Sequence, residues 1–471
     1  MVRRNLLVFG AIVAIPVAVV LVAIRLSGLG GGDHESSVDL RLAGPNLDVA
    51  RARGPQSEAA IAVDPNDART LVGGSNDIRG DRMRVFSSTD GGATWDSAPL
   101  VRGRSPICAA SDPSVAVDEH GRQYFGFLGL LCHARPVRPL VFIASRRSAT
   151  AKWRVRPLPV ARLGRLDIGD DRPIIAVDAA PESRHRGRLY FGWTLLSFVP
   201  FAAPRVAVVV SHSDDGGRRW SRPVILSRRG LPLEVRLDTA ADGMVYAVWR
   251  ASKTNTIYVA RSRNGGKTFT PGQIVAPAVV PRERSCHGFR SRIPAQPRRC
   301  VSPNPVVAVD RSDGPRRGRV YVTYGSTGLN QTQDVYVAAY DPDLRPLLGV
   351  RTLRTVTPPE AFGGPDQFLP SSAVDPATGW LWVCYYSTAS DRSRRVARYT
   401  CTASADGGST WAIPQAAATE PSNETIPRAN RANGYGDYEG LAVLGGTAHP
   451  IWTDSRKLRS FGEEIFTTTL R

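Results

Sequence analysis

Six positions in the sequence carry side chains that suit proton transfer or anion binding, and they recur at equivalent places in a repeat. Each lies just before a short apolar segment; the six are Glu58, Asp112, Arg172, Glu234, Asn304 and Tyr438. A carboxyl group can give or take a proton, and an arginine can bind a carboxylate through two parallel hydrogen bonds. If these side chains meet in space, they form a site that binds or cleaves an anionic sugar.

A second set of polar residues follows the same repeat. Some lie beside the first positions and others at the ends of the next segments; the set is Asp170, Asp171, Arg236, Asp437, Glu439, Asn76, Asp77, Arg250, Asp454 and Arg456. The alternative interpretation is structural, because polar groups at strand ends commonly cap the strands or hydrogen-bond to water. Both interpretations require elements that gather these positions on one face.

The repeat is a short apolar strand that ends in aspartate. Clear copies span residues 61–64, 115–118, 175–178, 307–310 and 372–375, and weaker copies span 237–240 and 441–444. A second strand with an aromatic end follows most copies, and we expect these aromatic residues to pack between sheets: Trp193, Trp249, Tyr324, Tyr385 and Trp452. Repeats with four short strands are typical of propeller blades. The sequence therefore predicts an all-β, seven-bladed β-propeller, with six blades as the alternative.

The last repeat, from residue 436 onward, offers only three candidate strands. Residues 38–49, which precede the first repeat, can supply the fourth. This pairing would join the two ends of the propeller and remove the exposed sheet edges of an open ring.

The N-terminus begins with an apolar run over residues 5–26, in which Arg25 is the only charged residue. Such a run can cross a hydrocarbon core of about 30 Å. Arg3 and Arg4 precede it, so the positive-inside rule predicts a cytoplasmic N-terminus and an extracytoplasmic remainder. We expect a cytoplasmic stub and transmembrane signal anchor at 1–26, a linker at 27–37 and the propeller at 38–471. The alternative is a cleaved signal peptide and a secreted protein.

The six cysteines of this exported chain favour disulfides. The nearest pairs are Cys108 with Cys132, Cys286 with Cys300, and Cys384 with Cys401, although six cysteines allow 15 pairings. No Cys-x-x-Cys spacing accompanies them, so we expect no metal and no cofactor. The net charge of +19 is spread along the chain. This spread argues against a nucleic-acid-binding arm and favours attraction to anionic lipid head groups or acidic cell-envelope polymers.

Four turns share the pattern Ser-x-Asp-x-Gly-x-Thr-Trp. Their acidic or amide residues are Asp90, Asp215, Asn264 and Asp406; Arg219 replaces Thr in the second copy, and Phe269 replaces Trp in the third. In such a turn the Asp or Asn side chain caps the backbone and Gly adopts a positive φ. Calcium is not expected, because each turn offers too few converging oxygens.

These turns resemble the Asp boxes, or bacterial neuraminidase repeats, of the sialidase-like superfamily, and the resemblance covers about residues 57–471. In that superfamily the boxes join the third and fourth strands of a blade, on the side away from the ligand. The resemblance therefore implies that the box residues are structural. It assigns ligand binding to the opposite face, whose long loops we expect at 101–111, 130–138, 276–303, 353–368 and 420–435.

The resemblance also implies roles at the site. Tyr438 or Tyr435 would be the nucleophile, Glu439 its base, and Asp112 or Asp171 the acid. Arginines would hold the carboxylate of the substrate, and the other polar positions would line the site: Arg172, Arg236, Arg456, Glu58, Glu234, Asn304 and Asp454.

One motif departs from the sialidase pattern. Sialidases carry Arg-Ile-Pro before the first box, where this chain reads Gly54-Pro-Gln-Ser-Glu58, and Arg292-Ile-Pro294 occurs only late in the chain. Whether the protein is an enzyme therefore stays open. Our first expectation is a monomeric surface propeller that binds glycans or a partner. The alternatives are an exo-sialidase-like glycoside hydrolase acting on anionic sugars and a structural assembly factor at the membrane.

Overall fold

The structure is a computed structural model of the chain. It describes residues 38–100, 106–131, 139–158, 167–197, 205–277, 291–328, 332–347, 354–356, 364–427, 429, 434–456 and 462–471. The predicted anchor and linker lie outside these residues. Within the described residues, no helix has the length and apolar character needed to cross a membrane.

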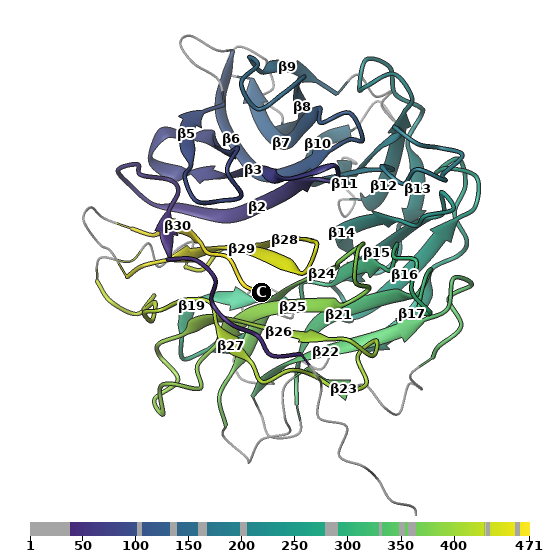
Figure 1. Ribbon diagram of the computed structural model, residues 1–471. Helices are drawn as coiled ribbons and strands as arrows, with labels where there is room; N and C mark the ends of the chain where they lie inside the picture. Colours follow the sequence, from purple (N-terminus) through teal and green to yellow (C-terminus); the bar gives the residue numbers. More distant parts are fainter. Residues whose placement is uncertain are drawn as a thin grey trace, which may run out of the picture. The chain divides into compact units, whose positions relative to one another are not determined.

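Seven four-stranded antiparallel sheets form the blades (Figure 1). Blade 1 contains β2 (Gln56–Asp64), β3 (Asp67–Asp77), β4 (Arg82–Ser88) and β5 (Asp96–Pro99), with the short 3-10 helix η1 (Ile78–Gly80) after β3. Blade 2 contains β6 (Ile107–Val117), β7 (Gln123–Leu131), β8 (Pro139–Arg146) and β9 (Arg154–Pro157). Blade 3 contains β10 (Asp167–Val177), β11 (Leu189–Ser197), β12 (Arg205–Ser213) and β13 (Val224–Ser227).

The remaining blades follow the same order. Blade 4 contains β14 (Pro232–Thr239), β15 (Val245–Ala251), β16 (Thr256–Ser262) and β17 (Gln273–Pro277). Blade 5 contains β20 (Val306–Val309), β21 (Val320–Thr327), β22 (Gln333–Tyr340) and β23 (Arg354–Thr355). Blade 6 contains β24 (Gln367–Val374), β25 (Leu381–Ser387), β26 (Arg398–Ser404) and β27 (Gln415–Ala416). Blade 7 contains β28 (Gly440–Leu444), β29 (Thr447–Asp454), β30 (Glu464–Thr467) and β1 (Leu47–Asp48).

The first strand of each blade contacts the first strand of the next, and β28 of blade 7 contacts β2 of blade 1. Figure 1 shows these two blades side by side, in yellow and purple. The blades therefore close into a ring. The prediction of seven blades is confirmed.

Buried apolar side chains of the described residues form seven clusters, one between each pair of neighbouring blades. The aromatic residues at the ends of the second strands lie in or beside these clusters, and Trp193 and Trp452 are at most 1% exposed. A single four-stranded sheet cannot bury both of its faces, so each blade depends on its neighbours.

The N-terminal segment closes the ring. Leu47 and Asp48 of β1 pair with Thr467 and Phe466 of β30, which makes β1 the outermost strand of blade 7. The backbone of Arg41 also exchanges hydrogen bonds with Arg471, at 2.9 and 3.1 Å. The predicted contribution of residues 38–49 to the last blade is confirmed.

Each Asp box lies between the third and fourth strands of its blade. In the first box, the Thr94 amide donates to Asp90 at 2.9 Å, and the Gly92 amide donates to the Ser88 hydroxyl at 2.9 Å. Hydrogen bonding from Thr94 lowers the pKa of Asp90 to about 2. The other three boxes repeat the bond to the acidic or amide side chain, from Arg219 to Asp215, Thr268 to Asn264 and Thr410 to Asp406. The predicted structural role of the box residues, and the place of each box between the third and fourth strands of its blade, are thereby confirmed.

One disulfide joins Cys384 and Cys401, which are paired residues on β25 and β26. Both side chains are fully buried. Cys108 and Cys300 are also disulfide-bonded. Their expected partners, Cys132 and Cys286, lie outside the described residues.

Candidate functional site

An unusual backbone conformation occurs within or just before the first strand in six of the blades. Six non-glycine residues there adopt positive φ values between 42° and 61°: Glu58, Asp112, Arg172, Glu234, Asn304 and Leu369. In five of these blades the residue falls where the register of the first strand shifts, as in a β-bulge. A bulge re-aims a side chain, and strained non-glycine residues cluster at functional sites.

These positions lie on the face opposite the boxes. Neighbouring strands of a blade are antiparallel, so the start of the first strand and the turn after the third lie at opposite ends of the blade. We call the group that gathers at this end the mouth cluster; it comprises Glu58, Asn76, Asp112, Asp171, Arg172, Glu234, Arg236, Arg250, Arg299, Asp437 and Tyr438.

Arg172 lies at the centre of the mouth cluster. Its guanidinium pairs with Glu234 at 2.9 Å and also with Asp437. Burial works against the charge of Arg172, but Glu234 and the other nearby carboxylates hold its pKa above the ordinary value. Arg250 pairs with the same Glu234 through two hydrogen bonds of 2.8 Å. Both arginines are therefore committed to carboxylates of the protein.

A second chain of contacts connects blades 1, 2 and 7. Arg299 pairs with Asp437 at 2.7 Å and with Glu58 at 3.3 Å. The Asn76 amide donates to the other oxygen of Glu58 at 2.8 Å, and its carbonyl accepts from the backbone of Asp112 at 3.0 Å. The contact of Glu58 with the chain of blade 7 requires a glycine, because a Cβ atom at Gly436 would lie 2.8 Å from the Glu58 Cγ.

Asp112 is the acidic residue of the cluster that most favours its protonated form. Burial raises its pKa to about 8, and the charges of Glu58 and Asp171 act in the same direction. Burial likewise raises the pKa of Asp171. Burial therefore favours the protonated form of Asp112 at neutral pH.

Tyr438 and Arg236 form the remaining part of the cluster. The Arg236 guanidinium lies 4.8 Å from the centre of the Tyr438 ring, and the Tyr438 hydroxyl donates to the Pro113 carbonyl at 3.2 Å. Burial, with the nearby Asp112 and Glu58, raises the pKa of Tyr438 well above its usual range. Within the described part of the chain, Arg236 has no carboxylate within salt-bridge distance, unlike the other three arginines of the mouth cluster.

Glu439 contacts a different tyrosine from the one the sequence assigned to it. Its carboxyl accepts from the Tyr386 hydroxyl at 2.6 Å and from the Thr453 amide at 3.1 Å. Burial raises the pKa of Glu439 to about 8. Tyr435, the alternative nucleophile, is fully buried and donates its hydroxyl to the Ser422 carbonyl at 3.0 Å. The nucleophile and base roles stay predictions, and in this structure Tyr438 and Glu439 are not hydrogen-bonded to each other.

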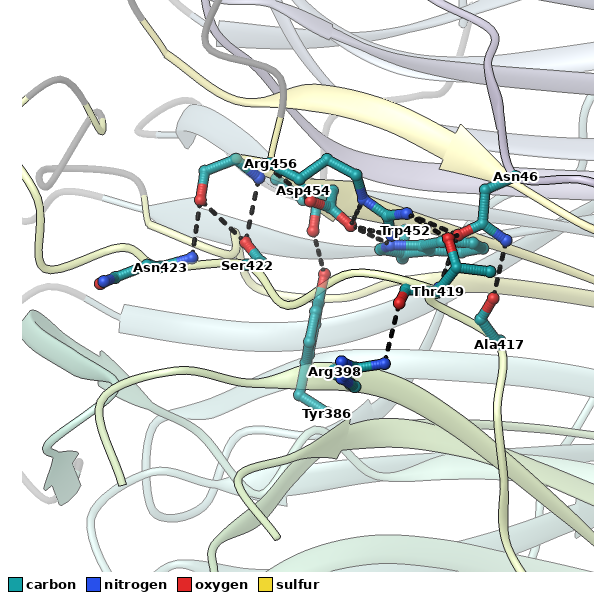
Figure 2. A network of polar contacts seen from close by, with 12 residues as sticks. Asn46, Tyr386, Arg398, Ala417, Thr419, Ser422, Asn423, Trp452, Asp454 and Arg456 are labelled. Carbon is teal, nitrogen blue, oxygen red and sulfur yellow. Dashed lines mark hydrogen bonds and ion pairs between the residues drawn. The ribbon is translucent and has the colours of Figure 1, made fainter. Parts of the chain in front are cut away.

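Asp454 and Arg456 lie in another network, between blades 6 and 7 (Figure 2). Arg456 pairs with Asp454 at 2.5 Å and donates to Asn46 at 2.6 Å and to Thr419 at 3.1 Å. Asp454 also accepts from the Trp452 indole at 2.8 Å. Their contacts connect the N-terminal segment to the last two blades.

Asn304 contacts blade 6 and is not part of the mouth cluster. Its amide donates to the Pro370 carbonyl of blade 6 at 3.1 Å, and its side-chain carbonyl oxygen is buried without a hydrogen bond. The structure brings ten of the polar residues that the sequence singled out into the mouth cluster: Glu58, Asn76, Asp112, Asp171, Arg172, Glu234, Arg236, Arg250, Asp437 and Tyr438.

A cleft of about 580 Å³ opens between blades 1 and 2 beside the mouth cluster. Apolar residues such as Leu128 and Leu130 form much of its lining. One polar lining residue, Asn76, belongs to the cluster, and another, Ser111, donates to Asp112 at 3.1 Å. Mostly apolar clefts of this size with a few polar groups are typical of small-molecule sites.

Sequence reasoning missed two residues. Leu369 lies six residues before Asp375, as Glu58 lies six before Asp64, so the repeat spacing could have found it. The repeat spacing could not have identified Arg299. It belongs to a hairpin outside the repeat, formed by β18 (Ser291–Ile293) and β19 (Gln296–Val301).

Comparison with known proteins identifies the fold. No protein-family model matches the chain, and no curated protein matches its sequence. The structure is similar to a protein of unknown function from Dyadobacter fermentans, with a TM-score of 0.51 and 13% identity over 92% of this chain and 99% of that one. It also matches a Trypanosoma rangeli sialidase bound to the inhibitor DANA, with a TM-score of 0.46 and 13% identity over 73% of this chain and 57% of that one. A leech intramolecular trans-sialidase matches with a TM-score of 0.47 and 10% identity, over 74% of this chain and 67% of that one.

Proposed function

We propose that the protein is an extracytoplasmic, membrane-anchored propeller that binds acidic glycans at the mouth cluster. The observation that carries this proposal is Arg236, whose guanidinium stacks on Tyr438 without a carboxylate partner in the described residues. An arginine held against an aromatic ring keeps its hydrogen-bond donors available to a ligand. The carboxylate or other anionic group of a sugar is the complement of this guanidinium.

Two further features support a sugar as the rest of the ligand. The cleft lined by Asn76 and Ser111 offers space next to the cluster, and its lining is mostly apolar with a few polar side chains. Sugars present both apolar faces and hydroxyl groups, so a cleft of mixed lining suits them.

A glycoside hydrolase is the second candidate, and Asp112 is the observation that favours it. A carboxylic acid that keeps its proton at neutral pH can protonate the leaving oxygen of a glycosidic bond. Burial holds Asp112 in this state by raising its pKa to about 8. A protonated Asp112 would also serve a binding protein, because its hydroxyl can donate a hydrogen bond to a ligand. Only a measurement of turnover therefore separates the two candidate functions.

The test uses the purified full-length chain and two acidic sugars, N-acetylneuraminic acid and glucuronic acid, with glucose as the neutral counterpart of glucuronic acid. We expect calorimetry to detect binding of an acidic sugar and no binding of glucose. Arg236→Gln should weaken this binding by about 10- to 100-fold, since a hydrogen bond to a charged group contributes about 1.5–3 kcal/mol. Arg222→Gln, an exposed arginine outside the cluster, is the matched control.

Release of a fluorophore from the corresponding glycosides separates the two candidates. Binding without turnover supports the binding function, whereas turnover that Asp112→Asn abolishes supports the hydrolase. Equal binding by the wild type and Arg236→Gln would refute the assignment of the site. The anchor is tested by fractionation: we expect the full-length chain in the membrane fraction and a chain lacking residues 1–35 in the soluble one.

A further inference from the structure

The β18–β19 hairpin interrupts the repeat between blades 4 and 5, yet its contacts are with the other side of the ring. Arg299 of β19 donates to Asp437 of blade 7 at 2.7 and 3.1 Å and pairs with Glu58 of blade 1 at 3.3 Å. Gln296 accepts a hydrogen bond from the Tyr435 amide at 3.0 Å. The hairpin therefore brings one additional guanidinium to the mouth from outside the seven blades.

The hairpin is held firmly enough to fix that guanidinium in place. Ile293, Ala295 and Val301 are at most 4% exposed and belong to the apolar cluster between blades 6 and 7. Cys300, which directly follows Arg299 in the chain, is disulfide-bonded. Arg298, the neighbour of Arg299 on the same strand, is exposed instead.

Arg299 changes the charge balance of the mouth. Glu234 and Asp437 each contact an arginine of the blades, Arg172. Within the described residues, the only arginine within salt-bridge distance of Glu58 is Arg299, at 3.3 Å. Without Arg299, the Glu58 side chain would have no arginine partner there. In a partly buried site an unpaired carboxylate repels an anionic ligand strongly, because charges are poorly screened there.

We propose that Arg299 is a specificity-determining residue that makes the mouth accept anions by neutralising Glu58 and Asp437, leaving Arg236 to bind the ligand. This inference rests on the proposed function at the same site. Arg299 is a positioning residue in this scheme, because its own donors are taken by the two carboxylates.

The test compares Arg299→Gln with Arg298→Gln, a matched change at the exposed neighbour, in the full-length chain. We expect Arg299→Gln to lower the affinity for the acidic sugar that the wild type binds by about tenfold or more, since it leaves an uncompensated carboxylate close to the ligand. Arg298→Gln should bind like the wild type. The thermal midpoint of each variant is recorded, so that a loss of folded protein is not counted as a loss of affinity.

A double variant distinguishes charge balance from direct contact. Glu58→Gln combined with Arg299→Gln removes both partners of one ion pair and leaves no unpaired carboxyl group at position 58, so we expect most of the affinity to return. Two results would overturn the inference: unchanged affinity in Arg299→Gln, or a double variant as weak as the single one, which would mean that Arg299 itself contacts the ligand. If the wild type binds neither N-acetylneuraminic acid nor glucuronic acid, the proposed function fails instead.

Discussion

The Arg236 guanidinium lies over the Tyr438 ring, 4.8 Å from its centre. Among the arginines of the mouth cluster, Arg236 is the one with no carboxylate partner in the described residues. The two residues come from blades 4 and 7, so the stacking connects distant parts of the ring. Such a contact contributes about 0.5–2 kcal/mol depending on its exposure. It orients the arginine without consuming its hydrogen-bond donors.

Tyr438→Phe and Tyr438→Ala test whether the ring or the hydroxyl is needed. If the ring is a platform for Arg236, Tyr438→Phe keeps sugar binding within about threefold, and Tyr438→Ala weakens it by about tenfold, which corresponds to about 1.4 kcal/mol. Calorimetry with the acidic sugar measures both. A variant Tyr438→Phe that binds normally but loses turnover would instead identify Tyr438 as the nucleophile.

The pH dependence of stability should carry the signature of Asp112. Its pKa rises from the ordinary 3.8 to about 8 in the folded protein, chiefly through burial. The protonated carboxyl therefore favours the folded state, and its contribution is complete below the pKa of the unfolded chain, near 3.8. This contribution is lost as the pH rises through about 8.

We accordingly expect the thermal midpoint of the wild type to decrease between about pH 4 and pH 9, and Asp112→Asn to decrease less. Glu439 acts in the same direction, because burial raises its pKa to about 8 as well. Scanning calorimetry across this range provides the measurement. Parallel curves for the wild type and Asp112→Asn would show that Asp112 is ionised at neutral pH.

Arg456→Met tests the network of Figure 2. The substitution leaves the carboxylate of Asp454, which is fully buried, without its arginine. Breaking one side of a buried ion pair costs about 3–5 kcal/mol, so the urea midpoint should fall markedly. Replacing both partners, as Asp454→Asn with Arg456→Met, should cost less.

Sugar affinity separates this structural role from the ligand-binding role that the sequence predicts. We expect the folded fraction of Arg456→Met to bind the acidic sugar as the wild type does, since Arg456 contacts Asn46 and Thr419 rather than the mouth cluster. A lower affinity at unchanged stability would support the ligand-binding role.

The disulfide on blade 6 should contribute to stability alone. Replacing Cys384 and Cys401 together with alanine should lower the free energy of unfolding by about 3 kcal/mol, the magnitude expected for a short closed loop. Urea unfolding under oxidising conditions measures the loss. Equal midpoints for the variant and the wild type would show that strand pairing alone fixes this part of the blade.

The blades and much of the mouth cluster could be predicted because they repeat. Glu58 and Arg172 occupy equivalent places, so the spacing to the aspartate at the strand end identified both. Arg456 was harder to place, since repeat alignment does not show which side of a strand a residue faces. Side chains alternate along a strand, and Asp454 lies two residues after Trp452, whose indole it contacts on the blade face.

The position of Arg299 could not have been read from local sequence. Its hairpin returns across the ring to meet Glu58 and Asp437, and such a path depends on packing among residues far apart in the chain. Arg292-Ile-Pro294 lies in the same hairpin, with Arg292 exposed. The motif thus occurs beside the mouth but in a different structural setting from the one its family pattern implies.

The left-handed residues in or just before the first strands have a consequence for how this surface can change. The backbone at each of these positions already holds its strained conformation, whether the side chain is an acid, an arginine, an amide or, at Leu369, an alkyl group. One backbone shape therefore accommodates very different chemistries. If the mouth binds a ligand as proposed, substitutions at these positions that also replace the ion-pair partner would change its chemistry without requiring a new course of the strands.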